Sequence, residues 1–189
     1  RTTYLHKIIK SDLESFGEFV VLPPESMLSL PTSKEEIYYK DWRLLGVDYL
    51  VKGGTKDSNL DGNTETNYII FDIAREKSIH RGNVIGPIKS LRKVAHKMSD
   101  KIYEKIQGIP GIFSTKLAYI DKPSSEDTNY NLRISDIDGF ESISLFSSPQ
   151  PLMSPSWSPD RKEIAYVSFE EGTSRIFLQE LSSAKRKGL

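Results

Sequence analysis

The sequence has no cysteine among its 189 residues, no long apolar run and no excess of charge of one sign. The absence of cysteine excludes disulfide frameworks, thiolate zinc sites and cysteine nucleophiles. The longest strongly apolar runs, such as Tyr68–Phe71, are far shorter than the ~20 residues that a membrane-spanning helix needs. The 26 basic residues are matched by 26 acidic ones, and the dense basic cluster Lys185–Lys187 stands alone near the end of the chain. A nucleic-acid-binding protein usually carries a basic excess or stripe, so nucleic acid is a poor candidate for a partner.

Catalytic signatures are also scarce. The three histidines, His6, His80 and His96, fall in predicted helices or strands and form no His-Glu-x-x-His pair, so we interpret them as packed or solvated side chains. There is no Gly-x-Ser-x-Gly elbow, phosphate-binding loop or Gly-x-Gly-x-x-Gly. We therefore predict no catalytic residue, no metal site and no cofactor.

One segment imitates a metal site. Asp57, Asn59 and Asp61 are spaced like the first ligands of a calcium loop, but the position of the bidentate glutamate is Tyr68. The flanking segments are predicted strands rather than helices. Because Asp, Asn and Gly are also the residues of tight turns, we interpret the segment as a hairpin turn.

The N-terminal half has helical periodicity and short strands. Apolar residues recur at helical spacing as far as Phe16, and Gly17 is well placed to end that helix. Further helices are predicted at 33–45, opened by the capping box Ser33-Lys-Glu-Glu36, and at 88–106. Strands are predicted at 19–22, 47–53, 66–73 and 78–85. Residues 1–110 are expected to form an α/β domain with helices packed on a mixed sheet.

Beyond Phe113 the helical period disappears and short strands alternate with turns. Strands are predicted at 116–120, 130–135, 142–146, 163–168 and 175–181, and Asp138-Gly139 is a strong hairpin signal. The segment Leu117–Ile120 returns as Ile164–Val167, within the ~40–50-residue period of β-propeller blades. Residues 111–189 are expected to form an incomplete β-propeller of about one and a half blades.

The repeat contains a distinctive motif, Ser-Pro-x-Trp-Ser-Pro-Asp, which ends at Asp160 and is followed by an apolar Ala-Tyr strand. Trp157 would bury a large face between blades. Ser158, Pro159 and Asp160 would form a tight turn. The six motif residues expected to have structural roles are Trp157, Ser158, Pro159, Asp160, Ala165 and Tyr166.

With its lead-in Pro-Gln-Pro-Leu-Met-Ser-Pro, this segment resembles the propeller repeat of the TolB family. The segments Leu45–Asp48, Gly108–Phe113 and Leu132–Phe140 look like TolB as well. The resemblance covers the chain from about Thr3 to Leu181 and crosses the predicted domain boundary, which distinguishes it from likeness to a generic propeller.

The resemblance implies a non-enzymatic, protein-binding scaffold of the Tol–Pal system in the periplasm of Gram-negative bacteria. Its implied partners are the peptidoglycan-associated lipoprotein (Pal), TolA and colicins. Its implied role is to maintain outer-membrane integrity and constriction during cell division. Four propeller residues, Arg133, Asp136, Asp138 and Gln150, are expected to belong to the partner surface.

This sequence departs from the family pattern in three ways. The family usually has glycine after the Ser-Pro-Asp turn, where Arg161 stands here, so a positive φ at this position would cost roughly 1 kcal/mol. The family also has a segment before the position of Arg1 and a six-bladed propeller. We therefore expect a truncated chain, without its signal peptide, whose unpaired blade edges promote self-association.

Two alternatives remain open at the level of the sequence. The repeats could belong to an accessory propeller region of a larger hydrolase or peptidase whose catalytic domain lies downstream. They could also belong to a surface scaffold that reuses one TolB domain. The TolB-like segments ahead of the propeller argue against both alternatives.

Overall fold

The computed structural model describes residues 2–57, 62–122 and 128–189. It divides the chain into an N-terminal unit, Arg1–Ser114, and a C-terminal unit, Thr115–Leu189. Asn59 and Asp61 of the calcium-like segment lie outside the described residues. Within the described part of the chain, no helix is both long enough and apolar enough to cross a membrane.

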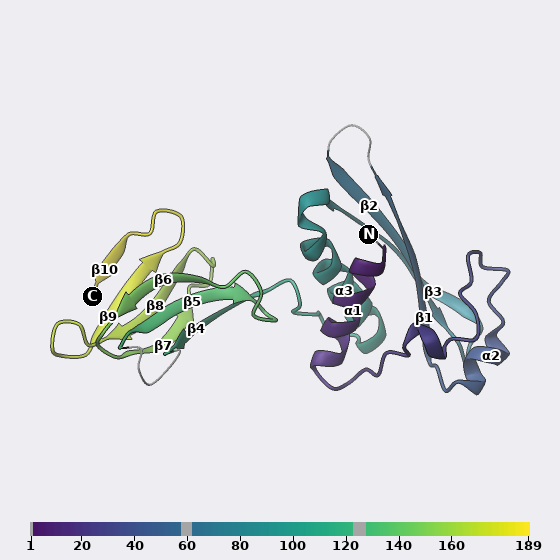
Figure 1. Ribbon diagram of the computed structural model, residues 1–189, viewed down its shortest axis with the longest axis horizontal. Coiled ribbons are helices and arrows are strands. Elements are labelled where there is room, and N and C mark those ends of the chain that lie inside the picture. The colour runs from purple at the N-terminus through teal and green to yellow at the C-terminus, as the bar shows by residue number, and fades with distance from the viewer. Residues whose placement is uncertain (1, 58–61, 123–127) are drawn as a thin grey trace. The chain divides into compact units, whose positions relative to one another are not determined.

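The N-terminal unit is a three-stranded sheet covered by helices (Figure 1). Its elements are α1 (Thr2–Ser15), η1 (Pro24–Ser26), α2 (Tyr39–Leu44), β1 (Tyr49–Asp57), β2 (Asn63–Asp72), β3 (Lys77–Pro87), η2 (Ile88–Ser90) and α3 (Leu91–Gln107). The strand order is β1-β2-β3, and both strand pairs are antiparallel. The α/β fold class is confirmed, but the sheet is antiparallel where a mixed one was expected.

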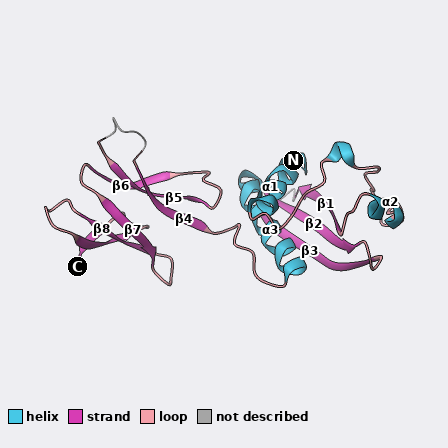
Figure 2. Cartoon of the chain, turned by 90° about the horizontal axis from the view of Figure 1, so that it is seen from below, coloured by secondary structure: helices cyan, strands magenta, loops and turns pink. Residues whose placement is uncertain are grey.

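Two apolar clusters hold this unit together. Helices α1 and α3 lie side by side and bury their apolar stripes against one face of the sheet (Figure 2). Tyr68 and Ile70 of β2 belong to the same buried cluster. A smaller cluster forms around Trp42 of α2, which packs with Phe71 and Ile73. Helix α3 ends where predicted, because Gly108 adopts φ 78° and donates its N–H to the carbonyl of Glu104.

Two local predictions for this unit are wrong. Residues 19–22 form no strand: Val20 is 98% exposed, and the N–H of Val21 donates to the carboxylate of Glu14 instead of to a neighbouring strand. The helix expected at 33–45 is reduced to α2. The carboxylate of Glu36 does fold back, accepting from the N–H groups of Thr32 and Ser33, but these contacts close a single turn.

The C-terminal unit contains two antiparallel sheets. Their strands are β4 (Lys116–Asp121), β5 (Tyr130–Asp136), β6 (Ile143–Ser148), β7 (Leu152–Trp157), β8 (Glu163–Ser168), β9 (Arg175–Glu180) and β10 (Arg186–Gly188). The first sheet has the order β4-β5-β6 and the second has the order β10-β9-β8-β7. The incomplete propeller is thus confirmed. The strands β7 and β10 were not among those predicted.

The two copies of the internal repeat differ in their strand pairing. Strand β4 corresponds to β8 in sequence, but β8 pairs with β7 on one side and β9 on the other, whereas β4 pairs with β5 alone among the described strands. The equivalent side chains differ accordingly: Ile164 of β8 is 0% exposed and Leu117 of β4 is 41% exposed. An apolar residue on an unpaired edge strand is a site for strand pairing with another chain.

We therefore expect the chain to self-associate through β4, and we expect Leu117→Lys to weaken that association because it places a charge on the edge. Sedimentation velocity over a range of protein concentrations measures the effect. Leu28→Lys is the matched control, since Leu28 is also exposed but lies outside every strand. A wild-type chain that stays monomeric, or two variants that behave alike, would contradict this role of β4.

Candidate functional site

The Ser-Pro-Asp motif forms the turn that joins β7 to β8. The hydroxyl of Ser158 donates to Asp160 Oδ1 at 2.7 Å and accepts from the N–H groups of Lys162 and Glu163 at 3.2 and 3.0 Å. Asp160 also accepts from the N–H of Lys162 at 3.1 Å. The hydrogen bond from Ser158 is the main reason that the pKa of Asp160 lies below its ordinary value. All these hydrogen bonds are made within the turn itself.

Arg161 occupies the left-handed position of this turn, with φ 61°. Its N–H donates to the carbonyl of Ser158 at 2.9 Å, which closes the turn and fixes that conformation. A side chain with a Cβ is disfavoured there, and glycine is not. The positive φ that was considered for Arg161 in the sequence is therefore present.

The remaining motif residues lie in the core of the C-terminal unit. Trp157 is half-buried and packs against the cluster that contains Ile164 and Tyr166. The ring of Tyr166 stacks on Phe177 with ring centroids 6.2 Å apart, and burial raises the pKa of its hydroxyl while Arg186 opposes that rise. Ala165 lies half-buried beside them in β8.

Arg186 is the residue of this unit whose importance the sequence did not reveal. Its guanidinium carbon lies 3.6 Å from the ring centroid of Phe146 in the first sheet and 4.5 Å from that of Phe177 in the second. Its Nε donates to the hydroxyl of Tyr166 at 2.6 Å, and its Nη2 pairs with Glu170 at 3.0 Å. In the sequence it was part of the basic cluster Lys185–Lys187, and no local pattern separates it from its neighbours. It joins the two sheets of the C-terminal unit.

The four residues expected on the partner surface have different surroundings. Arg133 forms an ion pair with Asp121 at 3.2 Å and donates to Ser142. Asp136 is 5% exposed and pairs with Lys116 across β4 and β5. Asp138 and Gln150 are exposed, the first in the β5–β6 turn and the second between β6 and β7. Arg133 and Asp136 thus make contacts within the sheet, whereas the side chains of Asp138 and Gln150 are exposed.

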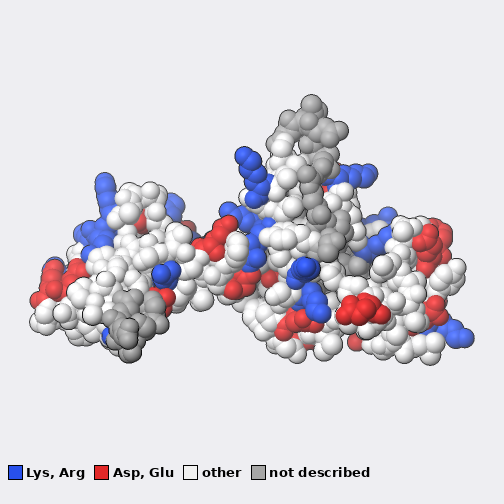
Figure 3. Space-filling view, viewed as in Figure 1, with Lys and Arg blue, Asp and Glu red and all other residues white. Residues whose placement is uncertain are grey.

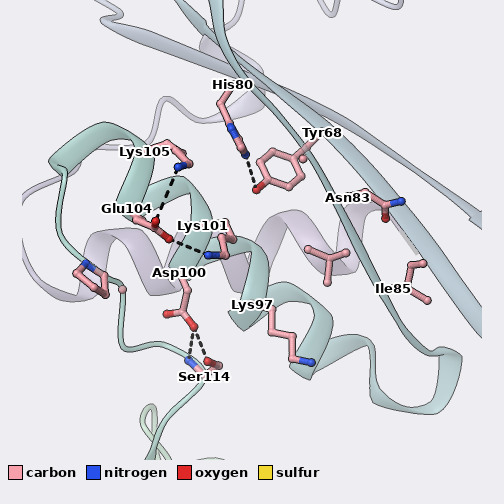
Figure 4. Close-up of a pocket in the computed structure, with 14 residues that line it drawn as sticks. Tyr68, His80, Asn83, Ile85, Lys97, Asp100, Lys101, Glu104, Lys105 and Ser114 are labelled. Carbon is pink, nitrogen blue, oxygen red and sulfur yellow. Dashed lines mark hydrogen bonds and ion pairs between the residues drawn. The ribbon is translucent and has the colours of Figure 1, made fainter.

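In the N-terminal unit a groove of about 730 Å³ lies between β3 and α3 (Figure 4). Its floor includes Tyr68, whose hydroxyl lies 3.4 Å from Nε2 of His80. Burial lowers the pKa of His80, and Lys105 and Lys101 lower it further through their charge. Three lysines of α3, Lys97, Lys101 and Lys105, line the opposite wall. This groove was not predicted from the sequence, although the four-residue spacing of these lysines is visible there.

A second histidine is fixed in the interior of the same unit. Nδ1 of His96 lies 2.9 Å from Oδ2 of Asp12, and the hydroxyl of Ser99 donates to that same oxygen at 2.6 Å. All three side chains are buried. The carboxylate stands between histidine and serine, so the histidine is not placed to take a proton from the hydroxyl as a general base would. The cluster ties α1 to α3.

Charge is distributed without a face of one sign on the surface seen in Figure 3, where basic and acidic side chains are interspersed over both units. This distribution agrees with the balanced composition.

Comparison with known proteins identifies the architecture. The model of the TolB amino-terminal domain matches residues 2–79, and the model of the TolB beta propeller domain matches residues 103–189. The chain belongs to the TolB family.

Individual TolB proteins align with nearly the whole of this chain. The Tol-Pal system protein TolB of Alcanivorax borkumensis is 40% identical over 181 residues, which cover 95% of this chain and 42% of that protein. The TolB of Pseudomonas entomophila is 38% identical over 182 residues, with the same shares covered. The crystal structure of TolB from Acinetobacter baumannii matches with a TM-score of 0.85 at 33% identity, covering 97% of this chain and 45% of that one. The chain therefore spans less than half the length of these TolB relatives.

The turn of the TolB motif supplies a direct test of strain at Arg161. We expect Arg161→Gly to raise the free energy of unfolding by about 0.5–1 kcal/mol, because the relief at positive φ exceeds the added freedom of glycine in the unfolded chain. Urea unfolding followed by far-ultraviolet circular dichroism measures the change. The control is Arg161→Ala, which keeps a Cβ at this position and should bring no gain. Equal stability of the glycine and alanine variants would show that the turn stores no strain.

Proposed function

We propose that this chain belongs to a non-enzymatic, protein-binding scaffold of the Tol–Pal system that works in the periplasm. The observation that carries the proposal is the order of two TolB domains in one chain, with 38–40% identity to proteins named for that system. The residues that make the propeller motif distinctive are engaged in holding a turn and a sheet. A scaffold of this kind acts through competition and linkage between bound proteins.

The partners that fit this proposal are Pal and TolA, with colicins as competitors for the same system. The scaffold would maintain outer-membrane integrity and support constriction during cell division. Because the chain spans 42% of its TolB relatives, we expect much of the binding surface of the longer proteins to lie outside it. Asp138 and Gln150 are the strongest of the four surface candidates, since both are exposed on the propeller.

The other class of function, an accessory propeller of a hydrolase, has weaker support. The described residues bring Ser99 and His96 to the same carboxylate rather than to each other, and His80 contacts a tyrosine hydroxyl. The TolB amino-terminal domain ahead of the propeller also fits the Tol–Pal proposal and not the hydrolase.

A binding titration against purified Pal tests the proposed function. We expect a full-length TolB relative to bind Pal and this chain to bind it at least about tenfold more weakly, because most of the propeller is outside the chain. Isothermal calorimetry gives both affinities. The affinity of Gln150→Ala for Pal is compared with that of Lys7→Ala. Gln150 lies on the propeller, and Lys7 is the control because it is exposed but lies on α1. If the full-length protein does not bind Pal, the proposed function is contradicted, whereas the family assignment is unaffected.

A further inference from the structure

The groove of the N-terminal unit is bordered by an open sheet edge. Strand β3 pairs with β2, and no other described strand pairs with its far side. Proteins commonly guard such edges with bulges, prolines or charges. Strand β3 has a bulge near its start and Pro87 at its end, but the stretch from Arg81 to Gly86 is regular, and Ile85 within it is 61% exposed. The edge of β3 from Arg81 to Gly86 is therefore regular and unpaired among the described strands.

The opposite wall of the groove carries a row of positive charge. Lys97, Lys101 and Lys105 are all exposed and follow one another at intervals of four residues along α3. Figure 4 shows the row running beside β3, with Lys105 toward His80 and Lys97 toward Ile85. Each step of four residues advances about 6 Å along a helix axis. The charges therefore have a regular spacing along the groove.

The acidic residues of the groove are already engaged. Asp100 accepts from the N–H of Phe113 at 2.6 Å and from the N–H and hydroxyl of Ser114. Glu104 pairs with Lys101 at 2.8 Å and lies 3.8 Å from Lys105. Lys97 has no ion-pair partner among the residues that the structure describes. Lys101 and Lys105 share Glu104, so the three lysines exceed the two carboxylates of the groove by one positive charge, and Lys97 is the lysine left for a ligand.

We propose that the groove between β3 and α3 binds an extended acidic segment of a partner protein, which adds to β3 as a new strand. Alternate residues of a strand lie about 6.6–6.8 Å apart and point to the same face. An acidic residue at every second position would thus meet the three lysines in succession, because their spacing of about 6 Å is nearly the same. The hydrogen bonds of the β3 edge would supply affinity, and the lysines would select for acidic side chains.

This surface lies in the N-terminal unit and goes beyond the Tol–Pal proposal, on which it does not depend. The probe is a fluorescein-labelled peptide with glutamate at alternate positions and valine or threonine between them. A second peptide has the same composition with its glutamates gathered in one block. Fluorescence anisotropy with the whole chain measures affinity for each peptide, and hydrogen exchange locates the bound peptide.

We expect the alternating peptide to bind at least about tenfold more tightly than the blocked one and to protect backbone amides between Arg81 and Gly86. The double variant Lys97→Glu with Lys101→Glu should weaken binding about tenfold through charge reversal. Lys93→Glu is the matched control, because Lys93 is exposed on the same helix but does not line the groove. Its affinity should stay within about twofold of wild type.

Four results would overturn the proposal: no binding of the alternating peptide at about millimolar concentration, equal affinity for the two peptides, protection of β1 in place of β3, or an equal effect of Lys93→Glu and the double variant. None of these results bears on binding of Pal, which is measured separately.

Discussion

The C-terminal unit depends on one side chain that holds two sheets together. The guanidinium of Arg186 lies over Phe146 of the first sheet and Phe177 of the second, and it donates to Tyr166. A cation over aromatic rings contributes about 0.5–2 kcal/mol, and a charged hydrogen bond contributes about 1.5–3 kcal/mol when it is well shielded. Arg186 is partly exposed, so the lower parts of these ranges apply.

This contact matters because each sheet is small. Neither a three-stranded nor a four-stranded sheet buries both of its faces alone, and the shared cluster of Leu132, Leu152, Ile164, Tyr166 and Phe177 forms only where the two sheets meet. Arg186 covers the aromatic part of that cluster. The Ser-Pro-Asp turn also stabilises this cluster, because it fixes the hairpin of β7 and β8 that brings Trp157 and Tyr166 into it.

Much of the fold could be predicted where the spacing of apolar residues and the positions of turn residues indicate the same element. The long helix ending at Gly108 and the hairpin at Asp138-Gly139 were of this kind. Strand β7 was missed for a physical reason: Pro155 argues against a strand, and the structure accommodates it with Ser154 at φ 53° and a register shift between Met153 and Ser156. The predicted strand at 19–22 failed because apolar residues alone do not supply a pairing partner.

The functional surfaces were harder to predict than the fold. The motif marked by Trp157 and Asp160 was found because its residues are consecutive, and its contacts lie within a turn and an apolar cluster. The groove beside α3 is formed by residues from β2, β3, α3 and the segment after it, and no single stretch of sequence contains it. Arg186 was hidden in a basic cluster, since its role depends on Phe146 of a different sheet. Family membership is the basis of the proposed function, because local chemistry does not specify one.

The most direct test of this account measures whether Arg186 stabilises the C-terminal unit alone. The two tryptophans report separately, since Trp42 lies in the N-terminal unit and Trp157 in the C-terminal unit. In a Trp42→Phe background, urea unfolding followed by Trp157 fluorescence should show that Arg186→Met lowers the free energy of unfolding by about 2 kcal/mol. In a Trp157→Phe background, the transition reported by Trp42 should not move. An unchanged Trp157 transition, or equal shifts of both, would contradict the central role of Arg186.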